Sequence, residues 1–125
     1  MKTFRNIAVG AAALTALAIP ASAHHSYSMF DMKKTIVLEG TVTQFRWQNP
    51  HAFIRTTVTV DGSREDWSIE MTSPNNLIQE GWTRTSLRNG DKVKLYVHPL
   101  RSGARGGSYS GVVLPNGKTL GTVES

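Results

Sequence analysis

Two stretches of this chain alternate apolar and polar residues, and a period of two restricts such stretches to β-strands. In residues 51–60 the positions predicted to face inward are Ala52, Ile54, Thr56, Val58 and Val60, and those facing outward are His51, Phe53 and Arg55. In residues 91–98 the inward positions are Val93, Leu95 and Val97, and the outward ones are Lys92, Lys94, Tyr96 and His98. Each stretch therefore predicts a strand with one face in a core and the other in solvent.

Turn signals connect further strands to these two. Asp61-Gly62 is a strong hairpin signal and leads into a third strand over residues 64–71. A first strand is expected from Ile36, but its apolar residues change face along the way: Leu38 and Val42 on one side, Phe45 and Trp47 on the other. This change predicts a bulge or sharp bend close to Gly40. Asn49-Pro50 makes the turn into the second strand.

One short helix is expected after the third strand. Ser73 is a good N-cap and Pro74 suits the first helical position, where its missing N–H would be unpaired anyway. Leu77 and Ile78 are predicted to cover the barrel, and Gly81 to end the helix. Further on, the glycine-rich residues 101–107 predict a mobile loop, followed by a fifth strand over 109–114 and a last short strand near 119–123.

This order of elements predicts an all-β domain with one short helix. Five strands, a bent first strand and a helix between strands three and four are typical of an OB-fold, a five-stranded Greek-key barrel. Another small antiparallel sandwich is the alternative. The predicted domain spans residues 36–125, with an extended N-terminal arm over 24–35.

The N-terminus has the three-part pattern of a cleaved secretory signal over residues 1–23. Lys2 and Arg5 precede an uncharged run from Ile7 to Ile19, and Ala21-Ser22-Ala23 offers small residues for cleavage. A membrane anchor is the competing interpretation, but a spanning helix needs about 20 apolar residues. We therefore expect a periplasmic protein that begins at His24 and has no membrane span after cleavage.

Composition limits the chemistry of that protein. The chain has no cysteine, which excludes disulfides, thiolate metal sites and a lipid-modified cysteine. Any metal would have to be held by nitrogen, oxygen or methionine sulfur. Loss of Lys2 and Arg5 with the signal lowers the formal net charge from +5 to +3, which by itself selects no partner.

Several segments together resemble a family of small exported bacterial proteins catalogued as a domain of unknown function, family 6152. They extend over nearly the whole mature chain: His24-His25-Ser26, Leu38 to Val42, Trp47 to His51, Glu70 to Leu77, Gly81 to Arg84, Gly90 to Val93 and His98 to Arg101. The resemblance implies export and a compact β-rich domain. It implies no activity.

All four histidines, His24, His25, His51 and His98, lie after the predicted cleavage site. A free His24 would offer its α-amine and its Nδ1, which close a six-membered chelate ring around a metal. The amine has a pKa of about 7.7–8.0, so a metal displaces its proton near neutrality. A second imidazole would complete a T-shaped nitrogen set suited to Cu(II). This resembles the histidine brace of copper-dependent polysaccharide monooxygenases and of some periplasmic copper carriers, in the terminal-histidine motif alone.

The second imidazole is expected from His51 or His98, and the extended arm can reach either. In an OB topology the two should lie toward opposite barrel ends, both facing outward. His51 is preferred because it sits among aromatic residues and next to a proline turn, whereas His98 faces a loop. The alternative is that these are ordinary polar residues: two acceptable to signal peptidase, one in a turn and one on a lysine-rich face.

Three function classes remain. The first is a periplasmic copper carrier or buffer that uses His24, His25 and one of the other histidines. The second is a non-catalytic module that binds a protein, glycan or small ligand on the barrel face around Trp47 and Phe53. The third is a copper oxidoreductase, which the sequence favours least because nothing in it shapes a substrate site. Nucleic acid is not expected, because the predicted protein is exported and only mildly basic.

Overall fold

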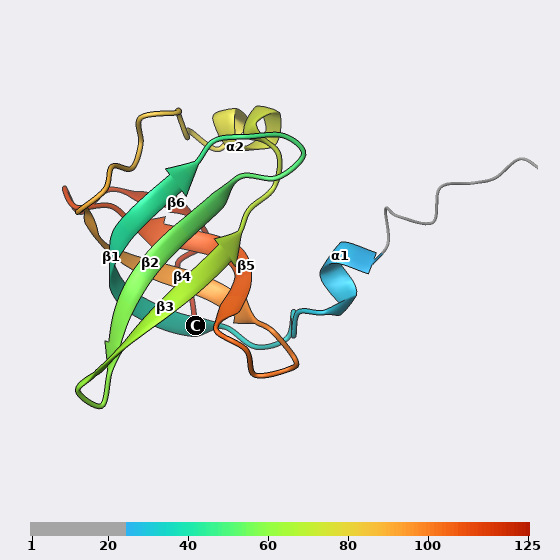
Figure 1. Ribbon diagram of the computed structural model, residues 1–125. Coiled ribbons are helices and arrows are strands. Elements are labelled where there is room, and N and C mark those ends of the chain that lie inside the picture. The colour runs from blue at the N-terminus through green and yellow to red at the C-terminus, as the bar shows by residue number, and fades with distance from the viewer. Residues whose placement is uncertain (1–24) are drawn as a thin grey trace, which may run out of the picture.

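The computed structural model describes residues 25–125, and the predicted signal and His24 lie outside them. The elements are helices α1 (His25–Ser28) and α2 (Pro74–Gln79), and strands β1 (Ile36–Arg46), β2 (Phe53–Val60), β3 (Ser63–Glu70), β4 (Lys92–Pro99), β5 (Gly106–Val113) and β6 (Thr119–Gly121). Figure 1 shows strands wrapped into a barrel, with α2 over one end and α1 off to the side.

The strands close into a five-stranded barrel. They neighbour one another in the order β3-β2-β1-β4-β5-β6, and a further parallel pairing of β3 with β5 closes the ring of β1 to β5, with β6 paired to β5 outside it. The helix α2 lies between β3 and β4 in the chain. This is the arrangement of an OB-like Greek-key barrel, and it confirms the predicted fold class.

Strand β1 serves both sides of the barrel. Its first part pairs with β4 and its second part with β2, and Gly40 pairs with Val58 and with Val93. A Cβ on Gly40 would lie 2.5 Å from Thr56 Oγ1, so only glycine permits this close approach. The bulge predicted from the change of phase is confirmed, but it lies between Val42 and Gln44 rather than at Gly40.

The hairpin at Asp61-Gly62 is also confirmed. Both residues have positive φ, +49° and +79°, as a two-residue turn requires. Strands β2 and β3 pair from Phe53–Glu70 to Val60–Ser63. The prediction that Val60 faces the core was wrong: it is 40% exposed, because the hairpin tip extends beyond the packed interior.

Helix α2 begins as its sequence predicts. The Ser73 hydroxyl accepts the amide N–H of Asn76, and Gly81 follows the helix end with φ of +101°. Leu77 is fully buried, whereas Ile78 is 56% exposed. Ile78 therefore does not cover the barrel, because a helix of this length turns only one narrow face inward.

The glycine-rich segment differs from its predicted loop. Gly106 and Gly107 are the first residues of β5 and are buried. A Cβ on Gly107 would lie 2.7 Å from the His98 carbonyl oxygen, and one on Gly106 would lie 2.9 Å from a Leu100 methyl. These glycines therefore serve close strand packing rather than mobility.

The barrel interior holds the predicted alternating residues. Apart from the exposed Val60 and the buried but polar Thr56, both predicted strands turn their inward residues into one apolar cluster, which also receives Trp82 and Leu87 from the segment before β4. Its buried members are Leu38, Val42, Ala52, Ile54, Val58, Ile69, Met71, Leu77, Trp82, Leu87, Val93, Leu95, Val97, Val112 and Leu120. Over residues 25–125, none of the helices has the length and apolar character needed to span a membrane.

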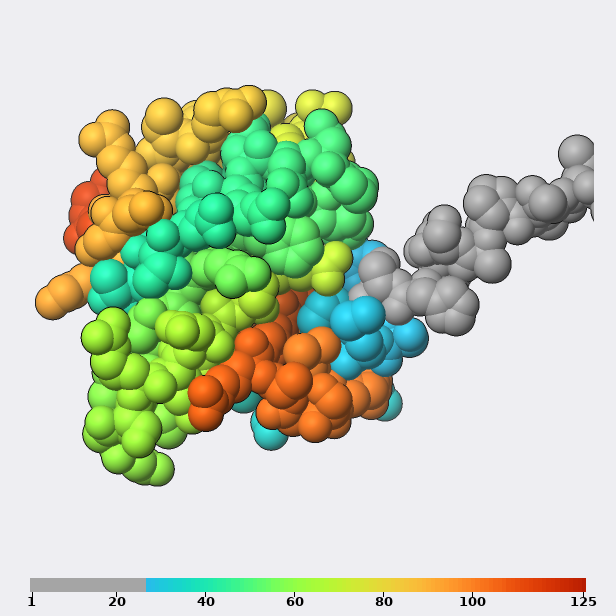
Figure 2. All heavy atoms as spheres, in the orientation of Figure 1, coloured from blue at the N-terminus to red at the C-terminus, as the bar shows by residue number. Residues whose placement is uncertain are grey.

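The N-terminal arm is bound to the barrel at its middle. It differs from the expected extended arm at His25–Ser28, which form one helical turn. Phe30 is only 3% exposed and forms a β-bridge with Leu100. The amide of Asp31 donates to Pro99 O at 2.8 Å, and the amide of Arg101 donates to Met29 O at 2.9 Å. In Figure 2 the arm, in blue, lies against the orange segment that leads into β5.

Candidate functional site

A pocket of about 210 Å³ lies between the arm and the barrel, and we call it the histidine pocket. The arm supplies one group of its lining residues, and the barrel and the end of α2 supply the others. They are Tyr27, Phe30, Met32, His51, Glu70, Met71, Thr72, Glu80, His98, Ser108, Tyr109 and Ser110. His51 and His98 therefore line one pocket, although the topology had led us to expect them toward opposite barrel ends.

Strand pairing explains how the two histidines come together. His98 on β4 pairs with Ser108 on β5, and Ser108 pairs with Glu70 on β3 through the parallel closure of the barrel. Directly paired residues project from the same face of a sheet. His98, Ser108 and Glu70 therefore form a row across three strands, and His51 lies 3.3 Å from the Glu70 carboxylate at the end of this row.

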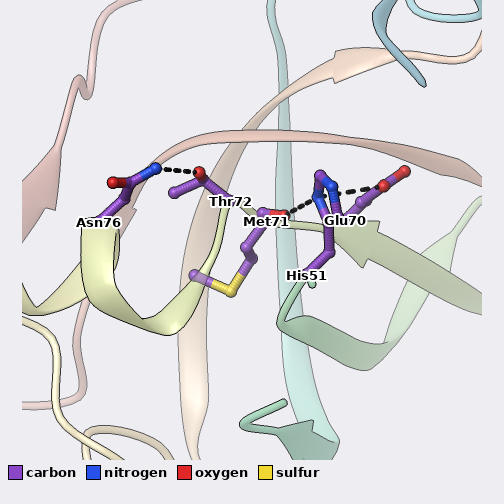
Figure 3. A network of polar contacts seen from close by, with 5 residues as sticks. All are labelled: His51, Glu70, Met71, Thr72 and Asn76. Carbon is purple, nitrogen blue, oxygen red and sulfur yellow. Dashed lines mark hydrogen bonds and ion pairs between the residues drawn. The ribbon is translucent and has the colours of Figure 1, made fainter. Parts of the chain in front are cut away.

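His51 stands just before β2 and has a fixed ring orientation. Its Nδ1 lies 2.8 Å from the carbonyl oxygen of Met71, which can only accept, so Nδ1 carries the proton. Glu70 Oε1 lies 3.3 Å from the same nitrogen (Figure 3). In the neutral ring the lone pair is then on Nε2. This arrangement, with one nitrogen bonded to a carbonyl or carboxylate, is typical of metal-binding histidines.

His98 is held in the same way at the other side of the pocket. Its Nδ1 donates to the carbonyl oxygen of Lys34 at 2.9 Å, which also ties the arm to the end of β4. The lone pair of neutral His98 is therefore on Nε2 as well. Two imidazoles of one tautomer thus line a single pocket.

The pocket lining is acidic although the chain is basic. It contains two carboxylates, Glu70 and Glu80, and none of the described lining residues is Lys or Arg. The chain as a whole has a formal net charge of +5. Partial burial raises the pKa of the Glu80 carboxyl above its ordinary value of 4.5. The local charge therefore favours a cation over an anion.

Tyr109 lines the pocket, and the buried Trp82 of the barrel core supports it from behind. The indole N–H of Trp82 donates to the phenol oxygen of Tyr109 at 3.1 Å, and their rings meet edge to face with centroids 5.5 Å apart. Burial raises the pKa of the Tyr109 phenol above its ordinary value of 10.0. Tyr109 is thus a neutral, rigid wall residue.

The residues predicted for a ligand face are not brought together. Phe53 lines a separate apolar pocket of about 200 Å³ together with Met29, Phe30 and Leu100. Trp47 lines neither this pocket nor the histidine pocket, and instead packs edge to face on Phe45 with ring centroids 5.8 Å apart. The structure thus places Phe53 beside the arm and makes Trp47 part of the core surroundings.

Among the side chains that the structure describes, no group of three or more His, Cys, Asp or Glu able to hold a metal occurs. His24 lies outside the described residues, and only the backbone of His25 is described, at the start of α1. The described part of the chain therefore supplies two imidazoles, and any further nitrogen ligand would have to come from the N-terminus.

Sequence reasoning missed Tyr27, Met32 and Glu70 as pocket residues. Tyr27 and Met32 stand in an arm without periodicity, so nothing local showed which side chains would face the barrel. Glu70 falls within the predicted third strand, where nothing in the sequence marked it as a site residue. The parallel β3–β5 pairing that places it near His98 is a long-range contact without a local signal.

Comparison with known proteins identifies the family alone. No curated protein and no solved structure matches the chain. The model of a family of unknown function matches residues 12–109, which is most of the chain. This chain therefore belongs to the family of unknown function DUF6152.

Proposed function

We propose that this protein binds a single copper ion in the histidine pocket and acts as an exported, periplasmic carrier or buffer of copper. The observation that carries the proposal is the convergence of His51 and His98 on one pocket, each with Nδ1 bonded to a main-chain carbonyl. Both histidines therefore offer Nε2 to a ligand. The acidic lining, without Lys or Arg among its described residues, supports a cation.

The N-terminus supplies the remaining ligands in this proposal. Tyr27 lines the pocket, and His24 precedes it by three residues in the sequence. Three residues of chain span at most about 11 Å, so the chain allows His24 to reach the pocket. After cleavage behind Ala23, the α-amine and Nδ1 of His24 would chelate the metal, and His25 stands beside them. The proposed ligand set is His24 with His51 and His98, with His25 as a substitute for one of them.

Copper is favoured by the nature of these ligands. Amine and imidazole nitrogens bind Cu(II) more tightly than the other divalent first-row metals, following the Irving–Williams order. Thiolate ligands are excluded because the chain has no cysteine. The proposal is for binding and not for catalysis, because nothing in the pocket is shaped for an identified substrate.

The test is a Cu(II) titration of protein whose first residue is confirmed as His24 by mass, followed by electron paramagnetic resonance. We expect one equivalent bound tightly, with a nitrogen-rich signal. A matched protein with three alanines added before His24 keeps every side chain, moves the α-amine away from the imidazole and leaves no histidine at position one, two or three, where the amine and main-chain amides would chelate Cu(II) themselves. This control should bind more weakly and with an altered signal.

A second possible result of this titration would contradict the proposal. Weak binding without fixed stoichiometry, the same in both proteins, would remove copper as the ligand. The apolar pocket around Phe53 would then become the starting point for a search for a protein, glycan or small-molecule partner.

A further inference from the structure

We infer that the histidine pocket is also a site for the reduced ion, Cu(I), with the thioether sulfur of Met32 as the third ligand beside His51 and His98. The inference rests on the proposed function for its two histidines, but it needs neither His24 nor a free α-amine. It starts from the lining of the pocket, where Met32 is the one solvent-accessible methionine among the described lining residues.

Met32 is held in place by its neighbours on the arm. It lies in a tight turn closed by the amide of Lys34, which donates to the carbonyl oxygen of Asp31 at 3.1 Å. The Asp31 amide is bonded in turn to Pro99, at the end of β4. On the other side of the turn, the Lys34 carbonyl accepts the Nδ1 proton of His98. Met32 therefore lies in a turn whose two ends are hydrogen-bonded to β4, at Pro99 and at His98.

The other methionines near the arm do not have this position. Met71 also lines the pocket, but it is only 3% exposed and belongs to the barrel core, so packing already occupies its side chain. Met29 is 48% exposed, close to the 45% of Met32, but it lines the apolar pocket beside Phe53 instead. Met29 thus resembles Met32 in exposure and in its place on the arm, and differs in the pocket it faces.

The donor atoms of the site determine which oxidation state of copper it prefers. A thioether is a soft, uncharged ligand that favours Cu(I), whereas amine and imidazole nitrogens suit Cu(II). Two imidazoles and one thioether give three donors, of which the sulfur is the soft one. The chain therefore offers the oxidised ion a nitrogen set that includes His24, and the reduced ion a set of two imidazoles and the Met32 sulfur.

The test measures Cu(I) affinity without oxygen, by competition with a chromophoric Cu(I) chelator, in the full mature protein. We expect Met32→Leu to weaken Cu(I) binding by at least about tenfold, the lower end of what even outer-shell partners contribute to metal affinity. Met29→Leu should leave it within about twofold. X-ray absorption at the copper edge should show a Cu–S contact in the parent protein and in Met29→Leu, and none in Met32→Leu.

Each outcome has a separate meaning. Equal Cu(I) affinity in the parent and Met32→Leu, or a spectrum without sulfur in the parent, overturns the role of Met32. A parent protein that binds Cu(II) but not Cu(I) overturns this inference and leaves the proposed function standing. Failure to bind either ion overturns both. Unchanged Cu(II) binding by Met32→Leu is the expected companion result and shows that the variant is folded.

Discussion

The Nδ1 of His51 lies 3.3 Å from Oε1 of Glu70, at the end of a row of side chains that crosses three strands to His98. The carboxylate and the Met71 carbonyl together fix the imidazole so that Nε2 is available (Figure 3). Carboxylates in this position orient a histidine ligand and raise its basicity.

Glu70→Gln should therefore weaken Cu(II) binding by about 10–100-fold, the usual effect of losing such a partner. The measurement is a Cu(II) competition titration. Glu39→Gln is the matched control, because Glu39 is an exposed carboxylate paired with Lys94 and lies outside the histidine pocket. Equal losses in the two variants would mean that only general charge matters, and that the contact with His51 has no role.

Much of the barrel could be predicted from local patterns. Alternation assigns Ile54, Val93 and Leu95 to the core correctly, because one face of each strand must be buried. The points at which burial ends along each strand and helix were less predictable. Val60 and Ile78 fit the apolar pattern yet are exposed, because a hairpin tip and a short helix extend past the packed interior.

The site could be predicted only in part, for a physical reason. Local patterns assign His51 and His98 to outward faces, but not to one pocket. Their approach depends on the parallel pairing of Glu70 with Ser108, which joins strands far apart in the chain. The same limit applies to Gly107. Glycine is needed there because a Cβ would contact the backbone of β4, whereas the sequence alone suggested a flexible loop.

Docking of the arm depends on Phe30. This side chain is 3% exposed yet stands outside the main barrel cluster, so its loss should release the arm and leave the barrel folded. Truncating a buried phenylalanine to alanine costs about 3–5 kcal/mol. In Phe30→Ala we expect hydrogen exchange at the amides of Asp31 and Arg101 to accelerate by at least about a hundredfold.

The amide of Ile54, within the barrel, should keep its rate in Phe30→Ala. Tyr27→Ala is the control on the arm itself, because Tyr27 is 50% exposed. If exchange accelerated equally at Asp31 and Ile54, Phe30 would be part of the global core, and separate docking of the arm would be contradicted.

The Trp82–Tyr109 hydrogen bond should contribute measurably to stability. Trp82 is 1% exposed, so Tyr109→Phe would leave a buried indole N–H without its acceptor. Such a loss costs about 1–3 kcal/mol, measurable by urea unfolding. Tyr96→Phe, on the outer face of β4, should change the free energy of unfolding much less. Equal stability of the Tyr109→Phe and parent proteins would contradict this role.

Glu80 should make stability depend on pH. Burial raises its pKa in the folded protein above 4.5, so the folded state holds this proton more tightly than the unfolded state does. Its contribution therefore becomes less favourable as the pH rises from 4.5 through the higher pKa of the folded state. Glu80 is also the C-cap of α2, where a negative charge opposes the helix dipole by about 0.3–1 kcal/mol.

Glu80→Gln should accordingly stabilise the protein near neutral pH and have little effect at a pH below 4.5, where the parent carboxyl is protonated. Urea unfolding at the two pH values measures the difference. A stabilisation of the same size at both would show that the charge of Glu80 is not the cause.

The most direct test of the shared pocket is nuclear magnetic resonance of the histidine rings during addition of substoichiometric Cu(II). Paramagnetic Cu(II) broadens signals from nuclei close to it. We predict that the ring signals of His51 and His98 broaden together, at the same copper ratio, while the methyl signals of Leu114, in a different pocket, stay sharp. Broadening of only one ring, or of neither, would contradict the claim that both histidines bind one ion.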